Sequence, residues 1–320
     1  MVDNSDTAVG YLMEGDPAIR WQAMRDLLAA APSQWQAERR LVSREGWGRR
    51  FLDCQLEDGS WQKERWTDTV WTLVQMCELG LIGEDDQCRR GFERVVGRHC
   101  PIGTEVDPVE LVKIMDLCHL GFWLRIGSTY CPDDPRLGGI LDSILLQQLP
   151  DGGWNCRTRT KPKTTHSSFH TTFNVLEGLR AAHEVGLIAS DSFLTFEDSA
   201  VTFMLEHHMY RSDKTGTVID ERFLDLTFPS HWHYTVLRGL DYLSGTKWIH
   251  DPRLDDALTW LTSRRKANGL WIVEKRIPGT VHFDMEAMGK DSRWNTLRAL
   301  RVLFRAERLR FTEGRYHSNS

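Results

Sequence analysis

A seven-residue pattern that occurs three times constrains this chain more than any other feature. Two copies run from a glutamine through Asp-Gly to a tryptophan, at Gln55–Trp61 and Gln148–Trp154. The third, Arg265–Trp271, keeps the glycine and the tryptophan but replaces the glutamine. An Asp-Pro-Arg-Leu sequence begins 20 residues before the second and third tryptophans, at Asp134 and Asp251. Such repeats indicate one supersecondary unit that buries its apolar face against neighbouring copies.

Helix signals dominate the rest of the chain. Asp16, Asp134 and Asp251 each precede a proline, and this pair is typical of a helix N-cap followed by the first helical position. Strand signals are scarce, and the clearest alternation covers Thr280 to Met285. The sequence therefore predicts an all-α fold, with a single domain over residues 16–311 and tails at residues 1–15 and 312–320.

A second helical repeat alternates with the capped helices. It comprises Asn174–Leu179, Thr235–Leu240 and Asn295–Leu300, whose starts are 61 and 60 residues apart, with weaker members at Thr69–Leu73 and Val109–Gly121. Two alternating series form either an open solenoid or a closed ring. The second series is apolar nearly all round, as buried inner helices are, whereas the capped series carries more charge. We therefore expect a ring with the capped helices outside. Gly152, Gly178 and Gly239, with Ala299, suit close backbone approach within or between helices.

The glutamine–tryptophan pattern, with apolar residues before each copy, resembles the QW repeat of squalene-hopene and oxidosqualene cyclases. It is also similar to the related repeat of protein prenyltransferase β subunits. The three copies span residues 51 to 271. The resemblance implies an α/α toroid, in which the glutamine caps a helix end and stacks against the tryptophan, so the motif itself is structural.

The chain departs from these families in its acidic residues. Class II cyclases carry a D-x-D-D motif that protonates the substrate, and Glu84–Asp86, Asp133–Asp134 and Asp255–Asp256 all lack the leading aspartate. A D-D-x-x-D diphosphate motif is absent as well. The length resembles one ring of the two in a full cyclase. The resemblance therefore supports the fold more strongly than the activity.

Composition excludes several partners. The net charge of −5 is spread along the chain, which argues against nucleic acid. No apolar stretch is long enough to span a membrane, and peripheral attachment through a smaller apolar patch stays open. The seven cysteines never form C-x-x-C, and we expect reduced, mostly buried thiols. A cytoplasmic location is expected, because the N-terminus lacks signal-peptide features.

Aromatic residues stand in one register immediately before the inner repeats, at Phe173, Tyr234 and Trp294. In a ring these side chains would face one central chamber, where aromatic faces bind an apolar ligand and stabilise a carbocation. Equally, aromatic residues at equivalent repeat positions are typical of a core. The substrate-binding candidates of the predicted chamber are Trp66, Asp68, His166, Phe173, Asn174, Trp232, Tyr234, His282, Trp294 and Arg298.

Histidines gather near the same register. His170, His231 and Asp291 lie four residues before the three inner repeats, and His233 adjoins Tyr234. We take His170 and His233 as acid–base candidates. If one helix covers both His166 and His170, this i,i+4 pair could also bind zinc with a third ligand. The alternative is that these histidines cap helices or bond carbonyl groups. No cofactor is clearly indicated.

The alternation in Thr280–Glu286 would place His282, Asp284 and Glu286 on one face. We expect this segment to cross the ring mouth and to present Asp284 or Glu286 as a general acid whose pKa is raised by burial. The set is also metal-capable, and an exposed edge with solvated charges is the alternative. Arg298 either holds a substrate anion or, like Arg238, pairs with an inner-helix acid such as Glu177 or Asp241.

Three functions remain after these considerations. We favour an enzyme of the terpenoid-cyclase or prenyl-chain type that acts on an apolar isoprenoid. A carbohydrate-active toroid that uses Asp68 and Asp284 is the second class. A ring without catalysis that binds a lipid or a partner protein is the third. A dry aromatic pocket favours the first class, an open groove with paired carboxylates the second, and a filled centre the third.

Overall fold

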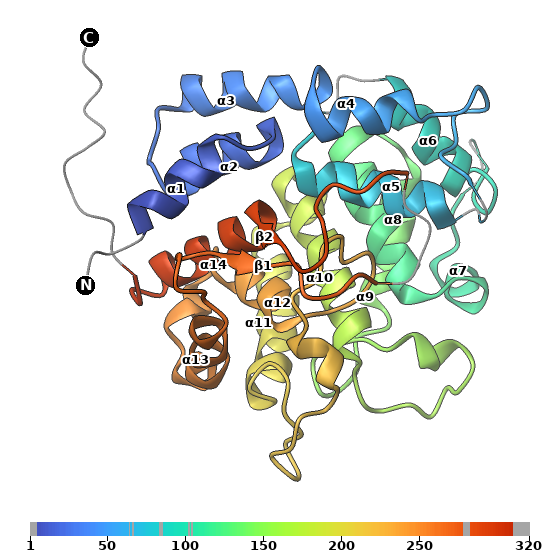
Figure 1. Cartoon of the computed structure of the whole chain (residues 1–320). Helices are drawn as coiled ribbons and strands as arrows, with labels where there is room; N and C mark the ends of the chain where they lie inside the picture. The colour runs from blue at the N-terminus through green and yellow to red at the C-terminus, as the bar shows by residue number, and fades with distance from the viewer. Residues whose placement is uncertain are drawn as a thin grey trace.

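Helices make up most of the protein, as expected (Figure 1). The computed structural model describes residues 5–63, 65, 67–82, 86–101, 103, 105–277 and 282–309. The α-helices are α1 (Ser5–Met13), α2 (Pro17–Asp26), α3 (Pro32–Arg40), α4 (Gly46–Asp53), α5 (Thr67–Leu79), α6 (Asp86–Val96), α7 (Pro108–Ile114), α8 (Leu117–Tyr130), α9 (Arg136–Leu145), α10 (Phe169–Glu184), α11 (Ser190–Glu206), α12 (Val236–Leu243), α13 (Asp255–Ser263) and α14 (Arg293–Arg305).

Short 3-10 helices and one small sheet connect these elements. The 3-10 helices are η1 (Leu41–Ser43), η2 (Cys156–Arg159), η3 (Glu221–Leu224), η4 (Lys247–His250) and η5 (Pro252–Leu254). Strands β1 (Trp271–Ile272) and β2 (Asp291–Ser292) pair antiparallel, with Trp271 opposite Ser292. The all-α class is thus confirmed.

The helices α2, α5, α8, α10, α12 and α14, the circuit helices below, contact one another in a closed circuit. Packing joins α5 to α8, α8 to α10, α12 to α14 and α14 to α2. Arg180 Nη1 in α10 donates to the carbonyl of Tyr242 in α12 at 3.1 Å, and Trp21 Nε1 in α2 donates to the carbonyl of Leu79 in α5 at 2.9 Å. Other helices flank the circuit, and Figure 1 shows α3 outside α2.

The tightest joint of the circuit lies between α8 and α10, where two glycines face each other. A Cβ atom added to Gly178 would lie 2.5 Å from the carbonyl oxygen of Gly121, and one added to Gly121 would lie 2.6 Å from that of Asn174. Backbone therefore packs directly on backbone here. Close approach at Gly178, expected from the sequence, is confirmed.

The three repeated tryptophans make the same contacts. The indole N–H groups of Trp61, Trp154 and Trp271 donate to carbonyl groups ten residues earlier, at 2.6, 2.9 and 2.9 Å. Each backbone N–H of these tryptophans donates to a threonine hydroxyl of a circuit helix, in Thr69, Thr172 and Thr296. All three indoles are fully buried. The repeat thus fastens the end of a flanking helix to the circuit helix that follows.

The glutamines of the repeat close its turn and reach the next flanking helix. Gln55 Nε2 donates to the turn glycine at 2.7 Å and to the carbonyl of Gln87 in α6 at 2.8 Å. Gln148 Nε2 makes the same turn contact at 2.7 Å. In the third copy Arg265 Nε donates to the turn glycine at 3.2 Å. The arginine therefore performs the local role of the glutamine.

The three aspartate caps are present, but they do not mark one layer. Asp16 accepts from the N–H of Ala18, Asp134 from that of Arg136 and Asp251 from that of Arg253, at 2.9, 3.0 and 2.9 Å. The helix after Asp16 is α2, which belongs to the circuit, whereas α9 and α13 flank it. The expectation that all capped helices lie outside is therefore wrong for α2, most of whose residues are buried.

Other boundaries also differ from the expectation. The predicted tail of residues 1–15 contains α1, whose Ala8, Val9 and Leu12 are buried because α1 packs on α2 and α14. The weak repeat expected over Val109–Gly121 is split, since α7 ends at Ile114 and α8 starts at Leu117. The strand expected from Thr280 is wrong in its described part, because residues 282–285 form bends rather than strand. Residues 310–320 lie outside the described residues.

Candidate functional site

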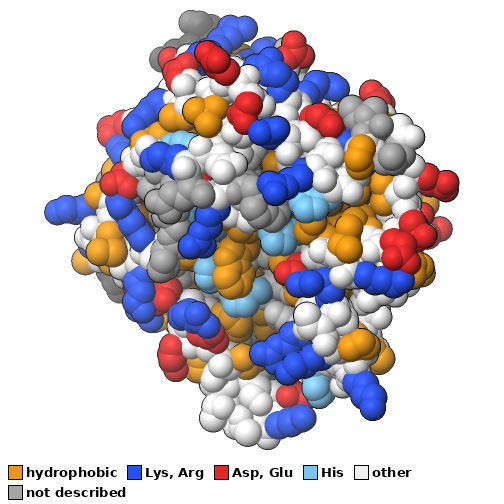
Figure 2. Space-filling model, turned by 90° about the vertical axis from the view of Figure 1, so that its right-hand side faces the viewer, with side chains coloured by type: hydrophobic (Ala, Val, Ile, Leu, Met, Phe, Trp, Pro, Cys, Tyr) orange, Lys and Arg blue, Asp and Glu red, His pale blue; other side chains and the backbone are white. Residues whose placement is uncertain are grey.

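A pocket of about 780 Å3, called the mouth pocket below, opens where α5, α8 and α10 begin. Figure 2 shows a face on which histidine and hydrophobic side chains gather near the centre, as they do in the lining of this pocket. Its volume lies within the range of about 300–1,000 Å3 that is usual for small-molecule sites. Its lining residues are Arg65, Thr67, Asp68, Trp71, Asp116, Cys118, His119, Asn155, Cys156, Ser168, His170, Thr171 and Trp232.

Aromatic rings form much of the wall of the mouth pocket. On one side, Trp71 meets Phe122 edge to face, with ring centroids 5.0 Å apart, and lies 6.2 Å from His119. On the other side, Trp232 stacks on His233 at 3.8 Å and meets His170 at 4.9 Å. Trp232 is 38% exposed, so part of its ring is available for contact. These rings come from α5, α8, α10 and the segment before α12.

The histidines near the pocket are held in the neutral form. Burial lowers the pKa of His170, His231 and His233 to about 4 each, and it also lowers the pKa of His119. His170 Nδ1 accepts the backbone N–H of Tyr234 at 2.8 Å, which places the ring proton on Nε2. The predicted acid–base residue His170 is therefore a neutral donor at the pocket, and His233 supports the stacked ring of Trp232.

Asp68 is the buried carboxylate of the mouth pocket. It lies in the first turn of α5 and accepts the backbone N–H groups of Lys63 and Arg65 at 3.1 and 2.9 Å. These contacts fold the preceding loop over the helix start and hold the carboxylate in place. The negative charge of Asp68 acts to raise the pKa of His231 and that of His282, against the effect of burial. Both histidines therefore lie near Asp68. Asp68 thus lines the mouth pocket, and its role in binding a substrate stays a prediction.

The two acids predicted as proton donors lie elsewhere, so this assignment is wrong. The side chain of Asp284 is 58% exposed and pairs with Arg276 at 2.7 Å. Glu286 accepts the backbone N–H groups of Arg293 and Trp294 at 2.8 and 3.1 Å, so it caps α14. Burial raises the pKa of Glu286, as expected, but among helix N–H groups rather than at the pocket. The alternating segment does not form a strand in its described part, so Asp284 and Glu286 do not lie together on one polar face.

His166 and His170 do not form the i,i+4 pair that was predicted as a possible zinc site. His166 is exposed and precedes the first residue of α10, Phe169, so His166 and His170 do not share a helix face. Across the described part of the chain, no three His, Cys, Asp or Glu side chains converge as metal ligands would. His282 packs edge to face on Phe51 at 6.2 Å. Trp66 lies outside the described residues.

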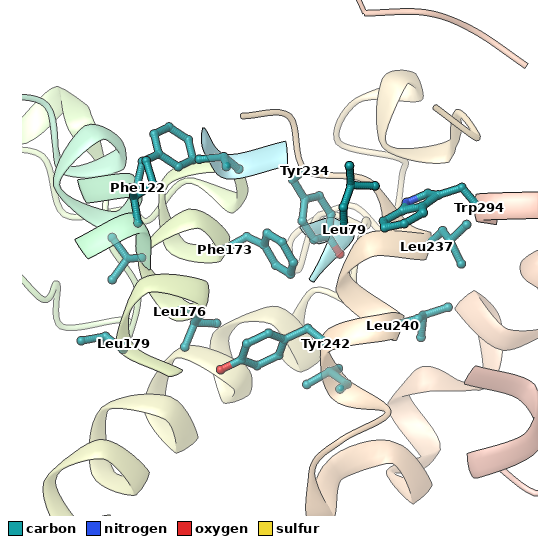
Figure 3. Packing of buried hydrophobic residues seen from close by; sticks show 14 of the residues in the cluster. Leu79, Phe122, Phe173, Leu176, Leu179, Tyr234, Leu237, Leu240, Tyr242 and Trp294 are labelled. Carbon is teal, nitrogen blue, oxygen red and sulfur yellow. The ribbon is translucent and has the colours of Figure 1, made fainter. Parts of the chain in front are cut away.

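Phe173 and Tyr234, two members of the aromatic register, prove to be core rather than pocket wall. Figure 3 shows Phe173, Tyr234 and Tyr242 pointing toward one another between α10 and α12, with Phe173 5.6 and 5.8 Å from the two tyrosine rings. Tyr234 donates its hydroxyl to the carbonyl of Met209. Asn174 is buried and donates to the carbonyl of Trp232 at 2.9 Å, which fixes the backbone beneath the pocket wall. Phe173, Asn174 and Tyr234 therefore support the site from behind.

Trp294 and Arg298 face a second pocket, of about 910 Å3, whose lining comes mostly from the middle and the C-terminal parts of the circuit helices. Arg298 pairs with Asp241 at 3.3 Å and with Glu78 at 3.5 Å, and its guanidinium lies 5.0 Å from the ring of Trp294. Trp294 also stacks on Phe228 at 4.8 Å. Arg298 thus makes the pairing with an acid that was expected as its alternative role.

Buried charges surround this second pocket, which we call the charged pocket. Glu177 accepts from Arg125 at 2.8 Å and from Arg238 at 2.6 Å, which joins α8, α10 and α12. Burial alone would raise the pKa of Glu78, yet Arg298, Arg238 and Arg125 bring it below its ordinary value. The pairing of Arg238 with Glu177, expected as an alternative to substrate binding, is present.

Sequence reasoning missed several residues of the mouth pocket. Trp71, Asp116, His119 and the two cysteines Cys118 and Cys156 belong to its wall. The signal for Trp71 was available, because it stands near the start of an expected inner helix, where mouth residues were expected. Asp116, Cys118 and His119 fell inside the helix expected over Val109–Gly121, whereas α8 begins at Leu117. Cys156 begins the short helix η2, and nothing in its surroundings in the sequence places it beside α8.

Comparison with known proteins assigns no relative. No protein-family model matches the chain, and no curated protein matches it. Within the described residues, none of the helices has both the length and the apolar character needed to cross a membrane. The proposals below therefore rest on the geometry of the molecule and on the QW-like repeat.

Proposed function

We propose that the circuit helices form the inner ring of an α/α toroid and that the protein is an enzyme acting on an apolar isoprenoid in the mouth pocket. The aromatic wall of this pocket is the observation that carries the proposal. The three repeats, with their shared tryptophan and threonine contacts, support the relationship to the cyclase and prenyltransferase folds. The residues that line the mouth pocket determine which substrates and which reaction suit it.

The wall suits a substrate that is apolar and passes through a cationic state. Each well-placed aromatic face stabilises a cation by about 0.5–2 kcal/mol, and Trp71 and Trp232 present such faces. The nearby histidines are neutral near pH 7, so they do not repel a developing positive charge. This arrangement favours an alkene over an anionic substrate.

Asp68 takes the role of proton donor that was expected for Asp284 or Glu286. Its carboxylate is buried in the pocket wall and held by two backbone N–H groups. When it carries a proton, a carboxyl group in this place can transfer it to a bound alkene, which becomes a carbocation, and as a carboxylate it can take a proton from a carbocation to give an alkene. His170, which carries its proton on Nε2, is the second group available for hydrogen bonding to the substrate.

A saccharide is the second candidate, because one observation favours it. Trp232 offers a partly exposed ring as a stacking platform, and two carboxylates, Asp68 and Asp116, line the same pocket. Asp116 pairs with Arg159 at 2.7 Å, however, and this neutralises one of the two charges. The pair Asp68 and Asp284 expected for this class is not assembled, since Asp284 pairs with Arg276 outside the pocket.

The test is to identify what the pocket retains and converts. Mass spectrometry of an organic extract of the purified protein should detect an isoprenoid, and incubation with farnesol or squalene should yield a product of changed structure. Asp68→Asn should abolish that conversion, whereas Asp284→Asn, the matched control at an exposed carboxylate, should leave it unchanged. Conversion that persists in Asp68→Asn would exclude the assigned role, and retention of a saccharide instead would favour the second candidate.

A further inference from the structure

Two cysteines from distant parts of the chain meet in the wall of the mouth pocket. Cys118 lies in the first turn of α8, and Cys156 begins η2. The backbone N–H of Cys118 donates to Cys156 Sγ at 3.3 Å. This distance brings the two residues within reach of each other although 38 positions separate them. Both cysteines are partly buried and line the same cavity.

A second donor points at the same sulfur from another helix. Thr171 Oγ1, in the first turn of α10, lies 3.3 Å from Cys156 Sγ. The same hydroxyl oxygen accepts the backbone N–H of Cys156 at 3.3 Å, so its own proton is free to point at the sulfur. The sulfur thus receives donors from the first turns of α8 and α10. The positive ends of both helix dipoles favour a negative charge there.

The electrostatics agree with this geometry. The hydrogen bond from the Cys118 thiol, followed by that from Thr171, lowers the pKa of Cys156 to about 7, although burial opposes the change. The pKa of Cys118 is raised well above its ordinary value by the same shared proton and by burial. Asp116 opposes a charge on either sulfur and is paired with Arg159.

The other titratable groups that line the mouth pocket are two histidines, an arginine and an aspartate. His119 and His170 line the pocket and are neutral, because burial lowers the pKa of each. Arg65 and Asp68 lie across the pocket, on the loop before α5 and in its first turn. The donors closest to Cys156 are therefore those of α8 and α10, and the partner thiol is Cys118.

We propose that Cys156 and Cys118 form a reactive dithiol, in which Cys156 attacks a hydroperoxide and Cys118 resolves the product as a disulfide. This site goes beyond the function proposed above and does not depend on which molecule fills the pocket. The Cys156 thiolate attacks the outer oxygen, the O–O bond breaks, and the alkoxide leaves and takes up a proton. Cys118 then attacks the resulting sulfenic sulfur, an S–S bond forms, and water leaves with the thiol proton.

Peroxide treatment of the full-length protein tests the reaction. The reduced and desalted protein is treated with one equivalent of hydrogen peroxide, digested without reductant and analysed by mass spectrometry. We expect a Cys118–Cys156 linked peptide before any oxidation of Cys54 or Cys77, two partly buried cysteines outside the pocket lining. In Cys118→Ser, a sulfenic acid should instead accumulate at Cys156 and be trapped by dimedone. Oxidation of Cys156 no faster than that of Cys54 would overturn the proposal.

Alkylation of the wild-type protein provides a readout that needs no cysteine variant. The rate of reaction with iodoacetamide at each cysteine, followed by mass spectrometry, should rise for Cys156 with a midpoint near pH 7. Thr171→Val removes the hydroxyl donor and should slow this reaction at pH 7 by about threefold or more. Thr262→Val, on flanking helix α13, should not change it. A profile for Cys156 that matches Cys54, or that ignores Thr171→Val, would contradict the proposal.

Discussion

The two ends of the circuit helices bury polar groups in opposite ways. At the charged pocket, arginines and carboxylates of neighbouring helices neutralise one another, as Glu177 does with Arg125 and Arg238. At the mouth pocket, aromatic rings and neutral histidines line the space, and Asp68 is held by backbone groups. The comparison indicates that the charged end holds the helices together, whereas the mouth leaves groups available for a ligand.

The difference follows from what the helix ends supply. Backbone carbonyl groups carry partial negative charge at the C-terminal ends, and arginines complement it there. The N-terminal ends offer N–H groups instead, and that of Cys118 in the first turn of α8 donates to the sulfur of Cys156. Asp68, in the first turn of α5, accepts N–H groups of the preceding loop. Variants that disturb one end and spare the other can break or sharpen this comparison.

The largest expected effect is on the charged pocket. Arg238→Met leaves Glu177 and Glu78 with less compensation, and the side chain of Arg238 is only 1% exposed. Removing one partner of a buried pair costs about 3–5 kcal/mol, so the free energy of unfolding should fall by that amount. Chemical denaturation measures it. Arg222→Met, which breaks the exposed pair with Asp220, should leave the midpoint unchanged, and equal effects of the two variants would refute a structural role for the charged pocket.

A second effect concerns the histidines of the mouth. In the unfolded chain a histidine binds a proton near pH 6.5, whereas His170, His231 and His233 do so only near pH 4 in the folded protein. Between these values the unfolded state holds more protons, so stability is full above pH 6.5 and decreases as the pH falls toward 4. His170→Gln should flatten this decrease in denaturation experiments at several pH values. A variant as steep as the wild type would show that His170 is not held neutral.

A smaller effect on stability is expected at the close contact between α8 and α10. Gly178→Ala places a methyl group against the backbone of Gly121 and should cost about 1–3 kcal/mol in unfolding free energy. Gly138→Ala, in flanking helix α9, is the control, because a Cβ there meets no atom within 4 Å. That variant should stabilise by up to about 1 kcal/mol. Destabilisation by both variants would argue against direct backbone packing of α8 on α10.

The smallest effect on stability is expected at the mouth wall. Trp232→Ala removes a ring that is already 38% exposed, so the melting temperature should change little. Phe304→Ala, with an exposure of 39%, is a matched control far from the mouth lining. Thermal unfolding followed by circular dichroism compares them. A large loss in Trp232→Ala alone would mean that the ring serves the core rather than a ligand.

Local patterns predicted well what local chemistry determines. The three tryptophan motifs, the aspartate caps and the close approach at Gly178 each depend on neighbours within one repeat unit, and their expected roles were met. The second helical repeat also led to the expectation of alternating inner and outer helices. That α2 would enter the circuit was not predictable from its cap, because an N-cap signals where a helix begins and not what packs against it.

The chemical site was predicted only in part, because its groups meet through tertiary packing. Asp68, His170 and Trp232 were identified from their place before or at the start of inner helices. Glu286 was misassigned because a period of two over seven residues does not distinguish a strand from a loop that caps a helix. Cys156 was not identified, since its meeting with Cys118 depends on how η2 packs against the first turn of α8.

Equilibrium dialysis of labelled farnesol against the wild type and Trp232→Ala tests the central claim most directly. The account predicts saturable binding to the wild type, at least tenfold weaker binding to Trp232→Ala, which corresponds to about 1.4 kcal/mol, and unchanged binding to Phe304→Ala. Maltotriose should not compete. Binding that fails to saturate, or that is equal in Trp232→Ala and the wild type, would contradict the assignment of the mouth pocket as an isoprenoid site.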